Sequence, residues 1–309
     1  MVGLGTIARF HLDALQRRGD VSVEAGVDPA PGKSLEFGGQ ARPVYPSISA
    51  LLERHEVDDV IVATPTPTHV EVCEEILEAE ARPRILVEKP LATAPGEVER
   101  VLARAGERQQ PLDVLYHFRW APEVLWAAAW WEEHRDDHGP VVDFLSFFSD
   151  PYAAMEPGRR WTYVSSWIDS GINALSLLDR LVDLREISTL TRMPGASSTY
   201  EAEIRFASQG REFTGHLMTT WHVTQDSKWT CLRLADGLEL FLDHVAVLGR
   251  ALHRGRTIAF QGSDGTVPRR TAHYLNLFHE VLSPTYSPQV ERHRHLHHLL
   301  LDRLTQGGG

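Results

Sequence analysis

The chain has 309 residues, which is long enough for two domains of ordinary size. Its 42% hydrophobic and 24% charged residues are typical of a globular protein, and no apolar run approaches the roughly 18 residues of a membrane helix. The net charge of −11 would repel a nucleic-acid backbone. Two cysteines, Cys73 and Cys231, are too few for a disulfide framework. These features predict a cytoplasmic protein that binds a small molecule rather than nucleic acid or membrane.

The first third alternates short β-branched runs with helical segments, which is typical of a parallel sheet with crossover helices. The predicted helices are Ile7–Arg18, Ser49–His55, His69–Ala79 and Glu97–Arg108. The predicted strands are Val21–Val27, Val57–Ala63, Arg84–Val87 and Leu112–His117. This order predicts an α/β Rossmann domain with a doubly wound parallel sheet over residues 1–118.

A turn that contains Gly3 and Gly5 opens the predicted helix Ile7–Arg18. The strand that should lead into this glycine turn is short, because only Met1 and Val2 precede Gly3. We expect a stub of strand there. We also expect the gene to encode about six further apolar residues upstream, enough for an ordinary strand.

Residues 119–309 show a different pattern, with several strands in succession. The predicted helices are Pro122–Arg135, Ile172–Leu181, Tyr274–Val281 and Val290–Leu304. The predicted strands are Val141–Phe148, Thr199–Phe206, Glu212–Trp221, Trp229–Leu234, Leu238–Leu242, Val245–Leu252 and Arg256–Phe260. Consecutive strands separated by turn residues favour an α+β domain with a large, mainly antiparallel open sheet.

An open sheet with helices mainly on one face leaves its other face to be covered. We expect Thr199–Phe206 and Glu212–Trp221 to supply apolar residues there. Two such faces would then pair in a homodimer or homotetramer.

The segment Gly3-Leu4-Gly5-Thr6-Ile7-Ala8 has the form G-x-G-x-x-A. The first glycine allows a tight turn, and the second lets the backbone approach a pyrophosphate at the positive end of the following helix. Asp28 either bonds the adenosine ribose or begins the next turn; its carboxylate would favour NAD over NADP, although Lys33 nearby leaves NADP open. The expected cofactor contacts in this region are Gly3, Gly5, Thr6, Ile7 and Asp28.

Two later segments follow buried strands on the same side as the glycine turn. Thr64 and Pro65, with His69, follow Val57–Ala63, and Glu88-Lys89-Pro90 follows Arg84–Val87. Ligands of open α/β sheets bind outside the carboxyl ends of the strands, so these residues are further candidates for cofactor binding. The alternatives are a helix start for His69 and a solvated surface pair for Glu88 and Lys89.

In order and spacing, the glycine turn, the Thr64-Pro65 segment with His69, and Glu88-Lys89-Pro90 resemble the glucose–fructose oxidoreductase / inositol dehydrogenase / MocA (Gfo/Idh/MocA) family. In that family the lysine of Glu-Lys-Pro contacts substrate and takes part in proton transfer. A second family motif, Asp-x-Gly-x-His-x-x-Asp at a helix start, corresponds here to Asp169–Ser176. Its histidine is replaced by Asn173 and its second acid by Ser176. An asparagine does not exchange a proton at neutral pH, so Asn173 would hold a substrate hydroxyl.

The segment Asp169–Ser176 is similar to that of a subgroup, the aldose 1-dehydrogenases that act on L-arabinose or D-galactose. Tyr116-His117-Phe118-Arg119 resembles the subgroup's Trp-His-Ser-Arg, Asp150 falls about where the subgroup carries an acid, and Glu156 replaces a histidine. Two tryptophans flanking the site either cover a sugar face or pack in the core. The resulting candidates for substrate binding are His117, Arg119, Asp150, Glu156, Trp161 and Trp167.

The resemblance implies an NAD(P)-dependent oxidoreductase that transfers a hydride between nicotinamide and a sugar-like polyol, with an aldose 1-dehydrogenase as the leading expectation. The alternatives are a ring-hydroxyl dehydrogenase or ketoreductase of a cyclitol or nucleotide-linked sugar, and a non-catalytic nucleotide-dependent regulator. Retention of Lys89 and Asp169 disfavours the regulator. We expect Lys89, Asp169 and Asn173 to converge on one substrate oxygen, with either Lys89 or Asp169 accepting the proton.

No metal is expected. Histidines gather near the C-terminus, but no carboxylate triad accompanies them, so we predict a solvated or packed helix rather than a metal site. These histidines are His293, His295, His297 and His298.

Overall fold

The computed structural model describes residues 1–194 and 198–306, and these form two compact units. The first comprises Met1–Leu115 and Tyr274–His298; the second comprises Tyr116–His273 and the residues from Leu299 onward. The expected second domain, 119–309, therefore includes a segment that belongs to the first unit. That segment is held there partly by Tyr274, whose ring centroid lies 4.2 Å from that of His11.

The first unit is built on a parallel sheet in which Val2 takes the central position. Val2 pairs with Val27 on one side and with Val62 on the other, which gives the order β4–β1–Val2–β5–β6–β7. β1 is shorter than the predicted Val21–Val27, because its partner β4 pairs only with Gly26 and Val27. The strands of this unit are β1 (Gly26–Val27), β4 (Val44–Tyr45), β5 (Asp59–Val62), β6 (Arg84–Glu88) and β7 (Leu112–Leu115), with a separate hairpin of β2 (Leu35–Phe37) and β3 (Gln40–Arg42).

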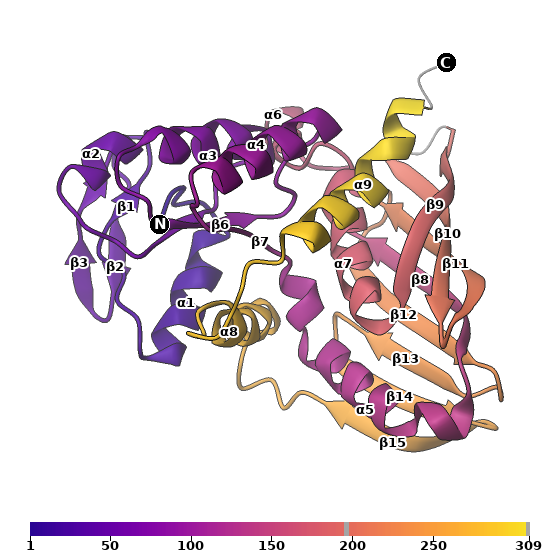
Figure 1. Ribbon diagram of the computed structural model, residues 1–309. Helices are drawn as coiled ribbons and strands as arrows, with labels where there is room; N and C mark the ends of the chain where they lie inside the picture. Colours follow the sequence, from indigo (N-terminus) through magenta and orange to yellow (C-terminus); the bar gives the residue numbers. More distant parts are fainter. Residues whose placement is uncertain (195–197, 307–309) are drawn as a thin grey trace. The chain divides into compact units, whose positions relative to one another are not determined.

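Helices cover both faces of this sheet. Figure 1 shows α3 and α4 on one face, and α1 with the Tyr274–Val281 part of α8 on the other. α1 ends at Gly19, which has a φ of +80° and donates its N–H to Leu15 O. This arrangement confirms the predicted doubly wound Rossmann fold. The helices are α1 (Ala8–Arg18), α2 (Ile48–Leu52), α3 (His69–Glu78), α4 (Pro95–Glu107) and α8 (Arg269–Val281), and a 3₁₀ turn spans Thr66–Thr68.

The second unit contains an eight-stranded sheet in the order β15–β14–β13–β12–β8–β11–β10–β9. Among the described strands of this sheet, only β8 and β11 are parallel neighbours; the other pairs are antiparallel. This confirms the predicted α+β domain with a mainly antiparallel sheet. The strands are β8 (Val141–Ser149), β9 (Asp183–Arg192), β10 (Thr199–Ser208), β11 (Arg211–Thr220), β12 (Ser227–Leu234), β13 (Glu239–Asp243), β14 (Leu248–His253) and β15 (Arg256–Gly262).

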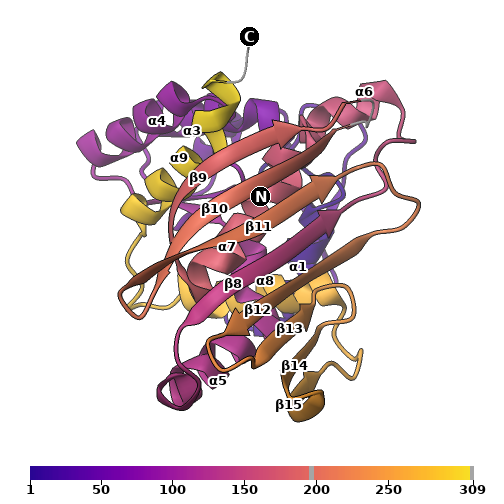
Figure 2. The same cartoon turned by 90° about the vertical axis from the view of Figure 1, so that its right-hand side faces the viewer.

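Two helices of this unit, α5 (Pro122–His138) and α7 (Ile172–Leu181), pack on one face of the sheet. In Figure 2 the strands lie in front of these helices, and the face toward the viewer carries no helix of this unit. Shorter segments connect these elements: 3₁₀ turns at His117–Trp120 and Trp161–Tyr163, the four-residue helix α6 (Pro157–Arg160), and a π-helical turn at Trp167–Gly171.

β9 is a ten-residue edge strand that the sequence pattern did not predict. Its register with β10 shifts at two places, so that Leu184, Ile187 and Leu190 recur at every third position instead of alternating. β14 begins later than the predicted Val245–Leu252. The Asp243 carboxylate accepts the N–H groups of the two residues after His244 and holds them in a turn.

The uncovered face of the sheet corrects one expectation. Thr199–Phe206 and Glu212–Trp221 were expected to place apolar residues there, but most of their large apolar side chains, such as Ile204 and Leu217, are buried on the opposite face. Their outward residues include Glu201, Glu203 and Arg205. The apolar residues of the uncovered face come mainly from β8, β12 and β13, and they include Leu145, Phe147, Trp229, Cys231 and Phe241, with Met218 from β11.

Two of the C-terminal histidines lie in the part of helix α9 (Val290–Gln306) that belongs to the first unit, and they hold it to other residues of that unit. His293 Nε2 lies 3.1 Å from Asp113 Oδ1, and His297 Nε2 accepts the Leu91 N–H at 2.9 Å. Over the described residues, no group of three or more potential ligands could hold a metal ion. Within the same residues, no helix is long and apolar enough to span a bilayer.

Candidate active site

The glycine turn lies between Val2 and α1 in the first unit. Gly3 has a φ of +85°, and a Cβ there would lie 2.7 Å from Ala63 O, so the close approach of the two chain segments requires glycine. Gly5 and Thr6 are exposed, and a Cβ on Gly5 would meet no atom within 4 Å. The open space and the positive N-terminal end of α1 fit a bound pyrophosphate.

Asp28 follows β1 and holds the glycine turn. Its Oδ2 accepts the Leu4 N–H at 2.9 Å, and its Oδ1 accepts the Ala30 N–H at 3.0 Å. Lys33 Nζ lies 3.8 Å from the same carboxylate and donates to Leu4 O. The location of Asp28 fits the adenosine ribose of the cofactor. The nearby Lys33 ammonium places a positive charge beside it, which could attract a 2′-phosphate.

His69 joins the two loops that follow β5 and β6. Its Nδ1 lies 2.7 Å from Pro90 O and its Nε2 lies 2.9 Å from Thr64 O. Burial lowers the pKa of His69, although these carbonyls favour the charged ring. Both ring nitrogens of His69 thus hold the two loops together. The buried Thr64 Oγ1 has no hydrogen-bond partner among the described residues, so it fits a cofactor contact. The neighbouring Pro65 is exposed.

Glu88 is buried, and it accepts hydrogen bonds from residues far apart in the sequence. Its Oε1 is 2.8 Å from His11 Nε2 and accepts the Tyr274 hydroxyl at 2.6 Å. Its Oε2 accepts the Lys89 N–H at 3.3 Å. Burial alone would raise the pKa of Glu88, but the bonds from His11 and Tyr274 and the nearby Lys89 charge outweigh it and lower that pKa.

These contacts give Glu88 a structural task, and its expected cofactor contact stays a prediction. It links α1, the loop after β6, and α8, and so fixes the backbone of the half-buried Lys89. Sequence reasoning missed both partners. His11 is four residues beyond Ile7 on the helix of the glycine turn, but no local pattern indicates that Tyr274 reaches the same carboxylate.

In the second unit, Asp169 and Asn173 lie together at the start of α7. Asn173 is 6% exposed, and its Nδ2 donates to Asp169 O at 3.1 Å. Its Oδ1 is buried and has no hydrogen-bond partner in the described part of the chain. An unsatisfied buried acceptor of this kind costs stability, and a ligand hydroxyl would satisfy it.

The turn Trp167–Gly171 that carries Asp169 is π-helical, a geometry that is frequent at functional sites. A Cβ on Gly171 would lie 3.1 Å from the Trp167 ring, which explains the glycine of the Asp-x-Gly motif. Trp167 is fully buried, and its Nε1 donates to Leu300 O at 2.7 Å. The structure therefore places Trp167 in the core, which is the alternative to a sugar-covering ring.

Lys89 lies in the first unit, whereas Asp169 and Asn173 lie in the second. Their expected convergence on one substrate oxygen stays a prediction.

The other candidates for substrate binding divide into buried and exposed residues. Arg119 is 8% exposed, and its Nη1 donates to Asp179 at 2.6 Å and to Ser176 O at 3.3 Å, so it holds α7. His117 is 7% exposed and faces His273, with the two Nδ1 atoms 3.2 Å apart. Trp161 is 49% exposed and Glu156 is also exposed.

Asp150 is buried, and both of its carboxylate oxygens are engaged. Lys228 Nζ donates to Oδ1 at 2.7 Å, and Ser170 Oγ donates to Oδ2 at 2.9 Å. Sequence reasoning missed Lys228, because a lone lysine within a strand pattern carries no signal.

A cluster of aromatic rings also escaped the sequence analysis. The Tyr152 ring centroid lies 4.6 Å from that of Tyr163 and 5.7 Å from that of Trp221. Burial raises the pKa of Tyr152, and the carboxylates of Asp169 and Asp150 raise it further. These aromatic rings therefore lie in the negative field of the Asp169 region.

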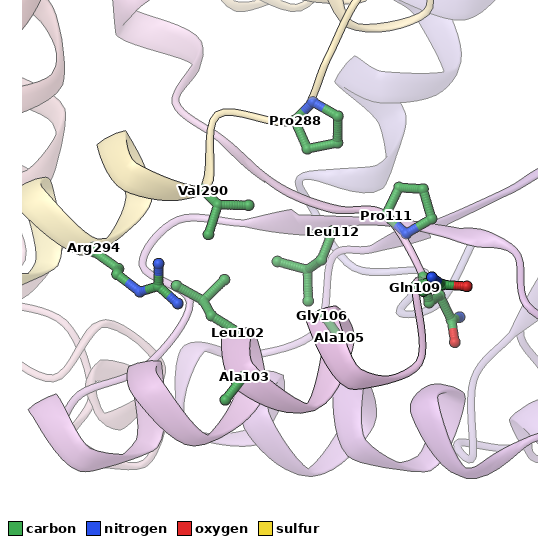
Figure 3. Close-up of a pocket in the computed structure, with 11 residues that line it drawn as sticks. Leu102, Ala103, Ala105, Gly106, Gln109, Pro111, Leu112, Pro288, Val290 and Arg294 are labelled. Carbon is green, nitrogen blue, oxygen red and sulfur yellow. The ribbon is translucent and has the colours of Figure 1, made fainter.

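A cavity of about 450 Å³ lies elsewhere in the first unit (Figure 3). It lies where α4 ends and β7 begins, at the N-terminal end of this edge strand, whereas the glycine turn follows the carboxyl end of the central Val2. Its lining is mainly apolar, with Arg294 on one side, and it includes none of the candidate site residues.

Residues 1–116 match the model of the Gfo/Idh/MocA family, described as an oxidoreductase family with an NAD-binding Rossmann fold. The chain is 31% identical over 124 residues to the rhizopine catabolism protein MocA of Rhizobium meliloti, covering 40% of this chain and 38% of that protein. It is 32% identical over 126 residues to UDP-N-acetylglucosamine 3-dehydrogenase of Acidithiobacillus ferrooxidans, with the same coverage. The matched segment thus spans less than half the length of these relatives.

The likeness of fold extends over the whole chain. An inositol dehydrogenase homologue from Azotobacter vinelandii, solved with NADH and myo-inositol, superposes with a TM-score of 0.79. The match covers 100% of this chain and 95% of that one at 17% identity. At that identity the likeness shows the fold alone.

Proposed function

We propose that the chain is an NAD-dependent dehydrogenase of a sugar or cyclitol hydroxyl, because residues 1–116 match the model of the oxidoreductase family with an NAD-binding Rossmann fold. The observation that carries the proposal is the buried Oδ1 of Asn173, which has no hydrogen-bond partner among the described residues, next to Asp169, whose backbone oxygen accepts the Asn173 Nδ2. The Asp169 carboxylate and Asn173 Oδ1 both accept hydrogen bonds. They therefore match the hydroxyl donors of a polyol, and the carboxylate would repel a phosphate.

The first unit would hold the cofactor. The glycine turn would take the pyrophosphate, Asp28 the adenosine ribose, and Thr64 Oγ1 a further polar group of NAD. When bound, the nicotinamide ring supplies the acceptor or donor of the hydride.

The residues of this chain supply binding and proton transfer. Asn173 orients the substrate through its Oδ1, and the hydroxyl proton passes either to the Lys89 amine or to the Asp169 carboxylate. Asn173 is excluded as the acid or base because an amide does not titrate near neutral pH.

Two substrate classes remain in competition. The similarity of Asp169–Ser176 to the aldose 1-dehydrogenases supports oxidation at C1 of an aldose. The relative named UDP-N-acetylglucosamine 3-dehydrogenase supports a ring hydroxyl. Purified protein should be assayed with NAD and matched panels of aldoses, cyclitols and UDP-linked sugars, reading the absorbance of the reduced cofactor. Activity on one panel identifies the class, and inactivity on all three contradicts the proposed function.

The first expected result concerns the choice of cofactor. NAD should bind more tightly than NADP, because the Asp28 carboxylate would face the 2′-phosphate. Asp28→Ala should reduce or reverse the ratio of NAD affinity to NADP affinity, since Lys33 remains in place to attract a phosphate. Titration of both cofactors against both proteins tests this. Tighter binding of NADP to the unaltered chain would contradict it.

Asn173→Ala is expected to weaken substrate binding and to change turnover less. The variant loses an acceptor for the substrate hydroxyl but no titrating group, so KM should rise by about tenfold, the equivalent of about one hydrogen bond. Steady-state kinetics at saturating NAD separate KM from kcat. A fall in kcat with an unchanged KM would show that Asn173 acts in the chemical step instead.

We propose that two chains pair through the apolar part of the uncovered sheet face. Leu145, one of its residues, is 42% exposed in the single chain. Leu145→Arg should dissociate a dimer or tetramer without unfolding the chain, because the side chain points away from the helix-covered core. Val245→Arg, in the turn before β14, is the control. Light scattering gives the mass; a monomeric unaltered chain would contradict the pairing.

A further inference from the structure

Lys228 of β12 is a lysine in an unusual place, because its side chain is only 4% exposed. Lysines are almost never fully buried unless they are paired. Burial lowers the pKa of Lys228, although the neighbouring Asp150 and Asp226 carboxylates act to raise it. An ammonium in such a place destabilises the fold unless its hydrogen bonds are satisfied, so its partners indicate its task.

The partners of Lys228 lie where β8 ends. Its Nζ donates to Ser149 O at 2.9 Å and to Asp150 Oδ1 at 2.7 Å, and Asp226 Oδ2 lies 4.0 Å away. β12 pairs with β8 in an antiparallel ladder. The ammonium therefore fixes both the last residue of β8 and the carboxylate that follows it.

That carboxylate continues the chain of contacts toward the candidate active site. Asp150 Oδ2 accepts the Ser170 hydroxyl at 2.9 Å. Ser170 is fully buried and stands between Asp169 and Gly171 in the π-helical turn. A continuous buried chain thus runs from Lys228 through Asp150 to the neighbour of Asp169.

We propose that Lys228 is a positioning residue for Asp169 and Asn173, acting through Asp150 and Ser170. The inference rests on the proposed function, which assigns a substrate hydroxyl to Asp169 and Asn173. A displacement of the turn would move both groups, since Asn173 Nδ2 is bonded to Asp169 O. This assigns Asp150 to the support of the site rather than to substrate contact.

The test uses Lys228→Met and Ser170→Ala in the full chain. Misplacement of catalytic groups by about 1 Å costs up to about 10²-fold in rate. Lys228→Met should therefore lower kcat by about 10–100-fold, and Ser170→Ala should lower it in the same direction by less. The Kd for NAD should stay unchanged in both, because the glycine turn belongs to the first unit.

A matched control separates positioning from a general loss of stability. Glu123→Gln weakens another buried pair of the same unit, Glu123 with His244, whose atoms are 2.8 Å apart and fully buried. It should lower the Tm while preserving kcat. If Lys228→Met and Ser170→Ala also lower only the Tm and keep kcat, Lys228 has a purely structural role and the inference is overturned.

A second readout needs no activity and keeps this inference distinct from the proposed function. The Trp167 indole N–H, bonded to Leu300 O, reports on the turn in a nitrogen-15 NMR spectrum, and Trp167→Phe identifies its signal. The signal should shift in Lys228→Met and Ser170→Ala but not in Glu123→Gln. If no polyol is oxidised, the proposed function fails, and the positioning claim stands or falls on this shift alone; an unmoved signal refutes it.

Discussion

Lys89→Ala is expected to lower turnover by about 10²–10⁴-fold, because loss of a proton-transfer group typically has that effect. Affinity for NAD should remain nearly intact. The glycine turn and Asp28 do not depend on the Lys89 side chain, and the loop after β6 is held by Glu88 and His69. Steady-state kinetics and cofactor titration together test the prediction.

Two comparisons complete this experiment. Lys33→Ala is the control, since it removes an ammonium of the same unit that lies beside the predicted ribose site and takes no part in proton transfer. It should change cofactor affinity and leave turnover at saturating NAD unaltered. A Lys89→Ala enzyme that keeps most of its turnover would remove Lys89 from the reaction.

Acidification is expected to destabilise the fold between about pH 6.5 and pH 4 through two buried histidines. Burial lowers the pKa of His273 to about 4, although the Glu123 charge opposes the shift. Burial likewise lowers the pKa of His297 to about 4. The unfolded chain binds more protons than the folded chain in this interval, so stability is full above the ordinary histidine pKa and is lost as the pH falls. Each shift corresponds to about 3 kcal/mol, a large part of the usual stability of about 5–15 kcal/mol.

Substitution by glutamine isolates this effect, since an amide keeps a hydrogen-bonding group but cannot take up a proton. His273→Gln/His297→Gln should retain its Tm better as the pH falls from 6.5 to 4. His298→Gln, an exposed position on α9, should follow the unaltered protein. Thermal unfolding across this pH range measures the difference. Equal losses of Tm in the double variant and the unaltered protein would show that other groups cause the acid sensitivity.

The sequence predicted the architecture well where the patterns are local. The G-x-G-x-x-A turn, the apolar runs of β5 and β6, and the succession of strands in the second unit follow from spacing and turn residues. β9 escaped because bulges break the alternation on which strand prediction depends. The return of Tyr274–His298 to the first unit escaped because it depends on tertiary contacts, such as that of Tyr274 with Glu88.

The motif residues of the candidate site were predictable from the sequence, but the residues that hold them in place were not. Lys89, Asp169 and Asn173 stand in recognisable local patterns, so residue type and spacing single them out. His11, Tyr274 and Lys228 have no such pattern, because each gains its role from a carboxylate distant in the sequence. Arg119 and Asp150 show the opposite case, because the family resemblance marks their positions for substrate binding. In the structure Arg119 is paired with Asp179 and Asp150 with Lys228, so their charges are already neutralised within the protein.

Lys89 and Asp169 are proposed to act on the same substrate oxygen, and a double-mutant cycle tests this proposal most directly. With NAD and the polyol identified in the screen, kcat is measured for the unaltered enzyme, Lys89→Ala, Asp169→Asn and the double variant. Groups that act as a unit have strongly non-additive effects. The double variant should therefore lose about as much turnover as the more damaged single variant. Losses that multiply would contradict the claim and show two independent contributions.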